Sequence, residues 1–518
     1  IVLQDNDGIY RPEDIDMDVI LRPDTTHAIV SCGDFYLNMD ASGSYEDLLS
    51  AIGNVSDEVI RQMDERYIDQ PMLRKRLPLA SIKLNSGSEN VVARMLKRYS
   101  IGCGSLAMDM TSSPTSGLNG YMRANAMTVS DILVDTASLV IFSDSSNVSY
   151  RMQVHNNKDN PDYIFNAIVE GTLTEKGTTI KSRLYDWKDR LGLATDMSAA
   201  MEDNGVKVTF IGDGPVLGYK KFAVNKDNYL FLSEDKRVSA NLKLRASDGT
   251  GLQVYTNDEN ADALQDITLS VNKLDLDDIF AILPFTPNMT GILDGDFHAI
   301  QTPDELTVSS SLTVSNMIYE GCRMGDVGTE FTYMPLSNGS HSVDGIMIHN
   351  GQEIGTLSGT YASEGDGFLD ATLSLAHTPL SLVNGFIPDQ LFGLNGYCEG
   401  DLSVKGPLSQ PQVNGELYLD SAYIFSLPYG VEMRFGNDPV TISGSRLLLE
   451  NFEMYSHNDK PLTTSGYIDF SNLDNMYADI RMRADNFLII DAKENSRSEA
   501  FGKAYVNFYG RMQGPVEN

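Results

Sequence analysis

The chain has 518 residues, of which 42% are hydrophobic, and its 72 acidic and 39 basic side chains give a net charge of −33. Nucleic acids and anionic membrane surfaces attract Lys and Arg, so this charge argues against both as partners, and we predict no nucleic-acid binding. No apolar run approaches the ~18 residues that a membrane-spanning helix needs. The acids are spread along the chain, which is typical of the solvated faces of strands.

The first hundred residues change character at residue 45. Residues 1–44 contain short apolar pieces typical of strands, and we treat them as a β segment. Residues 45–100 carry apolar residues at helical spacing, with Ser44 and Ser88 as possible N-caps, and predict a helical insertion. We expect its apolar faces to pack against a sheet.

Basic residues cluster in the same helical segment. Arg74-Lys75-Arg76 is followed by Arg94, Lys97 and Arg98. Two interpretations stay open: the cations offset acidic strands nearby, or they bind a phosphate headgroup or a partner. The chain opens at Ile1 without a signal-peptide pattern, so we expect any anchor or targeting signal to lie outside this segment.

From residue 101 the chain alternates strands and turns. Residues 101–264 predict a continuous β segment. Cys103 and Cys322 lie next to a glycine and Cys398 lies two residues from one, all at strand or turn positions, and we expect buried thiols there. The spacing of the four cysteines does not fit a disulfide framework or a zinc site.

The remaining residues form repeats. Leu269-Ser270-Val271 recurs as Leu373-Ser374-Leu375, which is 104 positions later. We predict repeat units at 265–370 and 371–480 and a truncated third unit at 481–518. Short helices before a proline are expected at Leu274–Leu283 and Leu380–Phe386.

One stretch shows the unit most clearly. Leu402 and Val404 alternate with polar residues, and so do Leu417 and Leu419. A turn rich in Gly, Pro, Ser and Asn separates the two runs. This pattern predicts a hairpin with one apolar and one polar face.

Motifs for catalysis and cofactor binding are missing from the sequence. The seven histidines are scattered, and we find no metal-binding pair, no nucleophile elbow and no phosphate-binding loop. We therefore predict no catalytic, cofactor-binding or metal-binding residues.

The Gly-x-Leu-x-Val-x-Gly-Pro hairpin of residues 400–419, with the strands leading to short helices at 269–284 and 373–388, resembles the TamB proteins of the AsmA-like superfamily. The resemblance is strongest from residue 265 onward. It implies an all-β fold with minor helices, in which an elongated antiparallel sheet curves into an apolar groove of the β-taco type. It also implies a periplasmic protein anchored in the inner membrane of Gram-negative bacteria by a helix that this chain lacks. The implied partners are phospholipid and a TamA-like outer-membrane β-barrel protein.

Under this resemblance the chain is a non-enzymatic lipid conduit for outer-membrane biogenesis that also aids outer-membrane protein assembly. The residues expected to line the groove are Leu269, Val271, Leu373, Leu375, Leu402, Val404, Leu417, Leu419, Ile468, Phe470, Val506 and Phe508. Two alternatives remain: a structural or adhesive β-repeat protein with a closed core, and a carbohydrate-active β-solenoid. A closed core would bury the same residues against each other.

Overall fold

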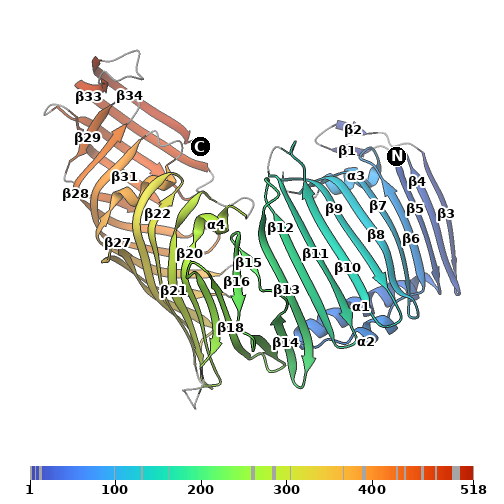
Figure 1. Ribbon diagram of the computed structural model, residues 1–518. Helices are drawn as coiled ribbons and strands as arrows, with labels where there is room; N and C mark the ends of the chain where they lie inside the picture. The colour runs from blue at the N-terminus through green and yellow to red at the C-terminus, as the bar shows by residue number, and fades with distance from the viewer. Residues whose placement is uncertain are drawn as a thin grey trace. The chain divides into compact units, whose positions relative to one another are not determined.

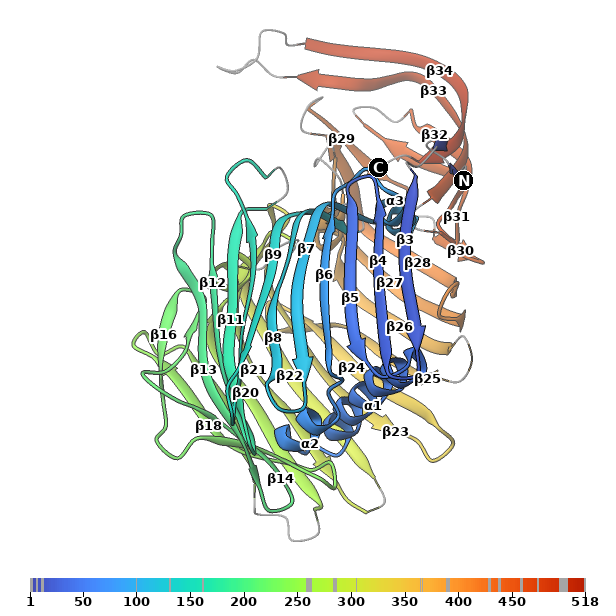
Figure 2. The same cartoon turned by 90° about the vertical axis from the view of Figure 1, so that its right-hand side faces the viewer.

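The computed structural model describes residues 3–5, 8–10, 14–98, 100–129, 132–160, 163–257, 263–282, 287–303, 305–363, 365, 367–387, 392–426, 430–436, 439–456, 460–472, 475–492 and 502–516. The chain divides into two compact units. Unit 1 comprises Ile1–Thr256 with Ala281–Pro284, and unit 2 comprises Asn257–Phe280 with Phe285–Asn518. Both are built mainly of antiparallel strands that curve along their length (Figures 1 and 2).

Unit 1 is a meander in which most strands pair with the strands that precede and follow them in sequence. Its strands are β1 (Leu3–Asp5), β2 (Gly8–Tyr10), β3 (Ile15–Arg22), β4 (Thr25–Cys32), β5 (Phe35–Ser42), β6 (Ala80–Ser86), β7 (Ile101–Ser113), β8 (Gly117–Val129), β9 (Ile132–Ser143), β10 (Val148–Asn156), β11 (Phe165–Thr174), β12 (Gly177–Tyr185), β13 (Leu191–Glu202), β14 (Gly205–Phe210), β15 (Val216–Leu217), β16 (Lys220–Val224), β17 (Tyr229–Ser233), β18 (Val238–Ala246) and β19 (Gly251–Thr256). The ladder runs from β3 to β13, then through β14 and β17 to β18. The short strands β15 and β16 bridge β13 to β18 beside β14 and β17.

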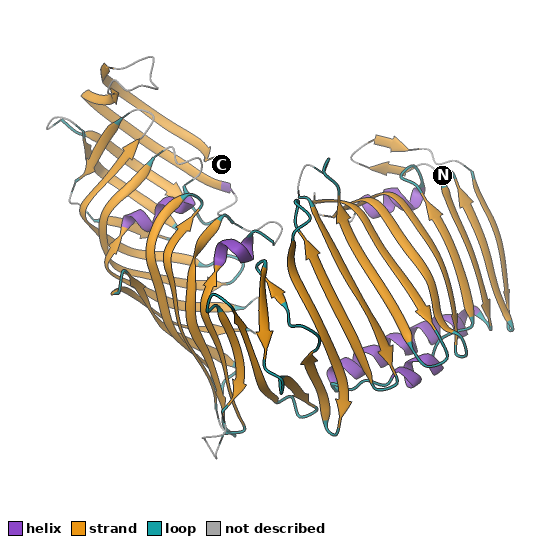
Figure 3. Ribbon diagram, viewed as in Figure 1, coloured by secondary structure: helices purple, strands orange, loops and turns teal. Residues whose placement is uncertain are grey.

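Three helices of unit 1 lie at the ends of its strands. They are α1 (Tyr45–Asp64), α2 (Gln70–Lys75) and α3 (Val91–Lys97). α1 and α2 run along one end of the strands and α3 lies at the other end (Figures 1 and 3). Ser44 caps α1 in a capping box with Asp47, as expected for this residue.

Two expectations about the helical segment need correction. α3 is capped by Asn90, whose side chain accepts from the Ala93 amide, and not by Ser88. The segment 45–100 is also not wholly helical, because β6 lies between α2 and α3 and pairs with β5 and β7. Ile82 and Leu84 alternate with Ser81, Lys83 and Asn85, and this short strand pattern was hidden between two helical patterns.

Unit 2 repeats the same meander with longer strands. Its elements are β20 (Gln265–Asp275), α4 (Leu276–Phe280), β21 (Met289–Gln301), β22 (Leu306–Tyr319), β23 (Cys322–Pro335), β24 (Ser340–His349), β25 (Gln352–Ala362), β26 (Phe368–Pro379), the 3-10 helix η1 (Leu380–Phe386), β27 (Gly393–Pro407), β28 (Gln412–Ser426), β29 (Val431–Phe435), β30 (Val440–Ser443), β31 (Arg446–Tyr455), β32 (Leu462–Asp469), β33 (Met476–Ala492) and β34 (Gly502–Val516). The short strands β29 and β30 lie between β28 and β31, and each pairs with both.

The predicted repeats share a backbone irregularity. The first strand of each copy carries a bulge that shifts its register against the next strand. At each bulge a residue other than glycine has a positive φ: Lys273 at 50°, His377 at 53° and Asn486 at 51°. Neighbouring side chains satisfy two of the displaced amides, since Lys273 N–H donates to Asp294 and Asn486 N–H donates to Asn507. A bulge bends its strand and sharpens the twist, so each copy turns the sheet at the same point.

Short helices lie where they were predicted, and they follow two of these bulges, which were not predicted; α4 is shorter than the predicted range. α4 begins at Leu276, and Asp275 accepts from the Asp277 amide at its start. η1 spans Leu380–Phe386 as expected, although it is a 3-10 helix. Leu283 and the prolines that were expected to end these helices, Pro284 and Pro388, lie outside the described residues.

The fold-class prediction of an all-β chain with minor helices and a curved antiparallel sheet is confirmed. The thiols differ from expectation in part. Cys398 is buried, but Cys103 and Cys322 are half-buried. Burial raises the pKa of the Cys398 thiol.

Candidate functional site

In unit 1, strand register lines up apolar side chains from successive strands. Directly opposed residues in an antiparallel pair project to the same face, so consecutive pairings trace rows across the sheet. One row consists of Met17, Val30, Leu37, Leu84, Met108, Met122, Leu139, Met152 and Val169. The row beside it consists of Val19, Ala28, Met39, Ile82, Met110, Gly120, Ile141 and Tyr150. We call the face that carries these rows the inner face.

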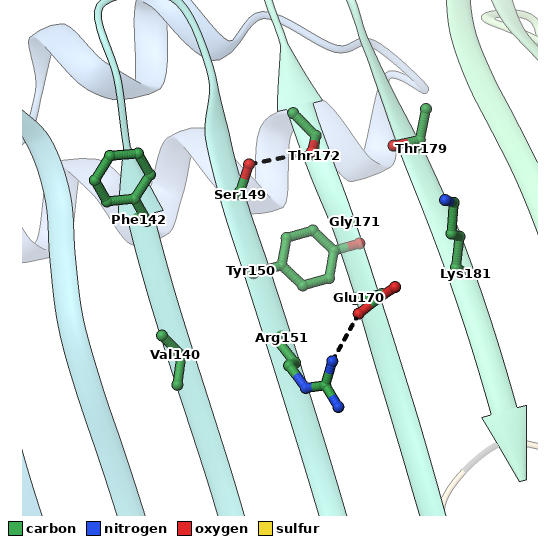
Figure 4. A pocket seen from close by; sticks show the side chains of 10 residues that line it. All are labelled: Val140, Phe142, Ser149, Tyr150, Arg151, Glu170, Gly171, Thr172, Thr179 and Lys181. Atoms are coloured by element: carbon green, nitrogen blue, oxygen red, sulfur yellow. Dashed lines mark hydrogen bonds and ion pairs between the residues drawn. The ribbon is translucent and has the colours of Figure 1, made fainter.

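The opposite face of the same strands is polar. A row on that face consists of Asp109, Tyr121, Val140, Arg151, Glu170, Lys181 and Asp196. A depression of about 330 Å³ lies there, and it contains an Arg151–Glu170 ion pair at 3.0 Å. Figure 4 shows this ion pair and the Ser149–Thr172 hydrogen bond in front of the strands, with the helices behind them. The two faces therefore differ sharply in chemistry.

A cavity of about 600 Å³ lies between α1 and the inner face. Val59 and Met63 of α1 line one side, and Leu139, Ile141 and Met152 line the other. Gln62 and Arg66 also border the cavity; the Gln62 amide donates to Glu58 and Asp69, and the Nη1 of Arg66 donates to the carbonyls of Ser233 and Arg237. The cavity therefore offers a hydrocarbon lining and is bounded by a helix and a sheet.

Polar contacts hold α1 in place. Glu58 is only 2% exposed and forms ion pairs with Arg61 on its own helix and with Arg76 just after α2, the latter at 3.0 Å. Hydrogen bonds from Arg61 and Gln62, helped by the charge of Arg76, lower the pKa of Glu58 to about 2. Gln62 also donates to the Asp69 carbonyl and accepts from the Asp69 amide.

The apolar stripe of α1 does not pack as expected. Ile52 is 52% exposed and Met63 is 73% exposed, while the side chains buried on α1 are Leu48, Glu58 and Gln62. The prediction that this stripe closes against the sheet is therefore wrong for most of the helix. The polar network fixes the opposite side of α1, which leaves the apolar stripe open.

The basic residues of this segment make structural contacts. Arg74 donates to the backbone carbonyls of Pro114, Thr115 and Asp144, which lie in the β7–β8 turn and just after β9. Arg76 is paired with Glu58. Arg74 and Arg76 therefore bond to turn carbonyls and to a helix carboxylate rather than to acidic side chains of the strands, and the interpretation as a phosphate or partner site stays a prediction.

In unit 2 the predicted groove residues fall into rows of the same kind. The row that contains Leu269 runs through Phe297, Ser310, Phe331, Gly345, Leu357, Leu373, Leu402, Gly415, Ile442, Leu447 and Ile468. Four candidates, Leu269, Leu373, Leu402 and Ile468, therefore share one row although nearly 200 residues separate the first from the last. The row beside it contains Val271, Leu375 and Leu417.

The other candidates lie around these two rows. Val404 opposes Ala371 and Val413 in a third row, and Leu419 opposes Cys398. Val506 opposes Phe487, and Phe508 opposes Ala484. Phe470 follows the end of β32 and has no strand partner in the described registers.

Burial of the twelve candidates is intermediate. Val271 is buried, Phe508 is 43% exposed, and the remaining ten are half-buried. A closed sandwich core would bury most of them. In unit 1, by comparison, the buried cluster of Phe222, Leu244 and Ala246 lies away from the cavity.

Glycines keep neighbouring strands close in these rows. A Cβ on Gly400 would lie 2.1 Å from the Glu416 carbonyl oxygen, and one on Gly415 would lie 2.1 Å from that of Asp401. Their φ values, 138° and 154°, are also unfavourable for other residues. The glycines of the repeat therefore allow neighbouring strands to approach each other closely.

Sequence reasoning missed the cavity of unit 1. The helical spacing of Val59 and Met63 and the strand pattern around Leu139 and Ile141 were visible, but nothing in the sequence paired the helix with those strands. Their juxtaposition depends on contacts far apart in the chain.

Comparison with protein-family models, curated proteins and solved structures finds no match. The assignment of a function must therefore rest on the geometry of the chain itself. None of the helices in the described part of the chain is long and apolar enough to cross a membrane. Among the described residues, no three His, Cys, Asp or Glu side chains are grouped so that they could hold a metal ion.

Proposed function

We propose that this protein is a non-enzymatic carrier that shields lipid acyl chains along the apolar face of its sheets. The observation that supports this best is the registration of apolar residues from many strands into rows that are half-buried or exposed and lie opposite a more polar face. A carrier of hydrocarbon needs an unbroken apolar surface and no polar recognition group.

The free energy of removing hydrocarbon from water favours such a surface as the part of the protein that binds lipid. Holding an acyl chain of ~15 methylenes in water costs about 12 kcal/mol at ~0.8 kcal/mol each. Side chains that stay half-buried in the protein can still lose their remaining exposed area to a ligand. The polar faces and the net charge of −33 keep the protein soluble beside this apolar surface.

The resemblance to TamB extends the proposal. It adds a periplasmic location, an inner-membrane anchor outside this segment, phospholipid as cargo and a TamA-like outer-membrane partner. The geometry of the two units supports the surface for acyl chains. It offers no argument for the partner.

Lipid extraction tests the proposal. The purified protein is extracted with organic solvent and analysed by mass spectrometry, beside Leu402→Asp/Val404→Asp and a Ser403→Asp control. Ser403 projects to the face opposite Leu402. We expect phospholipid with the wild type and the control, and depletion in the folded double variant. Lipid absent from all three would sink the proposal and favour a closed-core structural protein.

A second measurement tests which face of the sheet binds lipid. Trp187 is the only tryptophan, so Trp187→Phe gives a silent background for new tryptophans. Leu139→Trp places the indole on the inner face and Val140→Trp places it on the outer face. Brominated phospholipid should quench the first and leave the second unchanged. Equal quenching of both would mean that lipid adsorbs without a preferred face.

A further inference from the structure

We infer that α1 makes unit 1 a two-walled holding site for a linear acyl chain, with Val59 and Met63 as contact residues. This inference rests on the proposed function and deepens it, because it assigns a retention site to one helix. The ligand class is an unbranched hydrocarbon tail whose polar head remains outside the cavity.

The length of the cavity suits such a tail. Its sheet side extends from Leu118 on β8 to Leu232 on β17. Seven successive strand pairings separate these strands, which at ~4.8 Å each gives roughly 30 Å. The hydrocarbon core of a bilayer is ~30 Å thick and holds two opposed tails, so one tail spans about 15 Å. A full tail therefore fits.

The volume of the cavity excludes a protein helix. A helix has a diameter of ~10 Å, so a length of 30 Å would occupy roughly 2,000 Å³. The empty space between the helix and the sheet measures about 1,340 Å³ even with the part open to solvent included. An occupant that runs the length of the cavity must therefore be thinner than a helix.

The mainly apolar lining disfavours an extended peptide or a polar ligand. Gln62 donates to Glu58 at 2.8 Å and to the Asp69 carbonyl at 3.1 Å. Arg66 donates to the carbonyls of Ser233 at 3.3 Å and Arg237 at 3.1 Å. An extended peptide would bring backbone N–H and C=O groups to this lining and leave them without partners. A hydrocarbon chain has no such groups.

The apolar residues of α1 form the second wall of the cavity. The way in which α1 is attached explains why they stay available to a ligand. The helix is fixed through Glu58 and Gln62, and through Arg66 just after its end, by bonds to other protein groups. Met63 remains 73% exposed although it borders the cavity. Contact with a ligand would cover this area, so a tail under α1 should leave more slowly than a tail on the sheet alone.

Dissociation of a fluorescent fatty acid, cis-parinaric acid, tests the inference. The full chain is loaded with the probe, and release into excess vesicles of neutral phosphatidylcholine is followed by stopped-flow fluorescence. Wild type should show a slow phase, and Val59→Ser/Met63→Ser should release the probe at least tenfold faster in that phase. Leu49→Ser/Ile52→Ser is the matched control, since these residues belong to the same exposed stripe but do not line the cavity.

The possible outcomes distinguish the holding site under α1 from the more general carrier proposal. A slow phase that survives in Val59→Ser/Met63→Ser, or that is lost equally in the control pair, overturns the holding site while the carrier proposal stands. No probe binding by wild type overturns the carrier proposal and the holding site with it. A concentration-dependent dimer in gel filtration that only Val59→Ser/Met63→Ser dissolves would identify a second copy as the occupant. Unfolding of a variant is detected by circular dichroism, in which case the milder Met63→Gln replaces it.

Discussion

The two units use the same strand alternation with different results. In unit 1 the inner face is opposed by the 20-residue helix α1, and a cavity of about 600 Å³ lies between them. In unit 2 the described helices are α4 and η1, with five and seven residues, and both follow directly on the ends of strands. An apolar row is thus an open surface by itself and becomes one wall of a cavity when a helix lies over it.

The comparison also separates stabilising residues from surface-forming ones. Unit 1 has a compact buried cluster at Phe222, Leu244 and Ala246. Unit 2 buries Phe487 and Leu488 next to the bulge of β33. The row residues of both units are less buried than these, so the stability of each unit and its apolar surface depend on different side chains.

The largest expected effect is on the core of unit 1. Phe222 is 1% exposed, so Phe222→Ala should lower the free energy of unfolding of this unit by about 3–5 kcal/mol. Trp187 lies in unit 1, so urea unfolding followed by its fluorescence reports that unit selectively. Phe508→Ala, at a 43% exposed position in unit 2, is the control and should leave the fluorescence transition in place. An equal shift by both variants would mean that the units unfold together.

A row glycine of unit 2 should have the next largest effect. Gly415→Ala forces a Cβ against the Asp401 carbonyl oxygen at a positive φ, and should cost about 1–3 kcal/mol. Circular dichroism should show an earlier transition while the Trp187 signal stays unchanged. Glu416→Ala, at the exposed neighbouring position, should change little. Tolerance of Gly415→Ala would show that the two strands can move apart.

Acid should loosen the attachment of α1. The pKa of Glu58 is about 2 in the folded protein, against ~4.3 for an ordinary Glu. The unfolded state therefore binds more protons between these values, so the contribution of Glu58 is complete above about pH 5 and is lost as the pH falls toward 2. Melting temperatures of wild type and Glu58→Gln, read from Trp187, should differ at pH 7 and converge only as the pH approaches 2.

The control for this prediction is Glu65→Gln, because Glu65 is exposed and also pairs with Arg61. It should show a much smaller difference from wild type at pH 7. Parallel pH curves for wild type and Glu58→Gln would show that Glu58 does not fasten the helix.

The smallest effect is expected in the middle of α1. Gly53 has nothing within 4 Å of the position of an added Cβ. Gly53→Ala should stabilise the helix by about 0.5–1 kcal/mol through the lower backbone entropy of the unfolded chain. The Trp187 melting transition should rise slightly. A decrease would reveal that α1 needs to bend at this point, and would sharpen its contrast with the short helices of unit 2.

The sequence by itself determined the local pattern of this protein. Period-two alternation at Leu402, Val404, Leu417 and Leu419 predicted a two-faced hairpin, and the structure pairs Leu402 with Gly415 and Val404 with Val413. The Ser44 cap and the helix from Leu380 to Phe386 could also be predicted from the sequence, because capping and periodicity act within a few residues.

Only the tertiary structure decided what the apolar face of α1 meets. Its stripe has the spacing of a core-packing helix, yet Glu58, Gln62 and, just after the helix, Arg66 fix its position through partners up to 171 residues away. The same holds for the rows, since the register of each pair fixes which of the half-buried residues become neighbours. Sequence periodicity determines the face of the strand to which a side chain projects. Long-range strand pairing determines which other side chains lie beside it on that face.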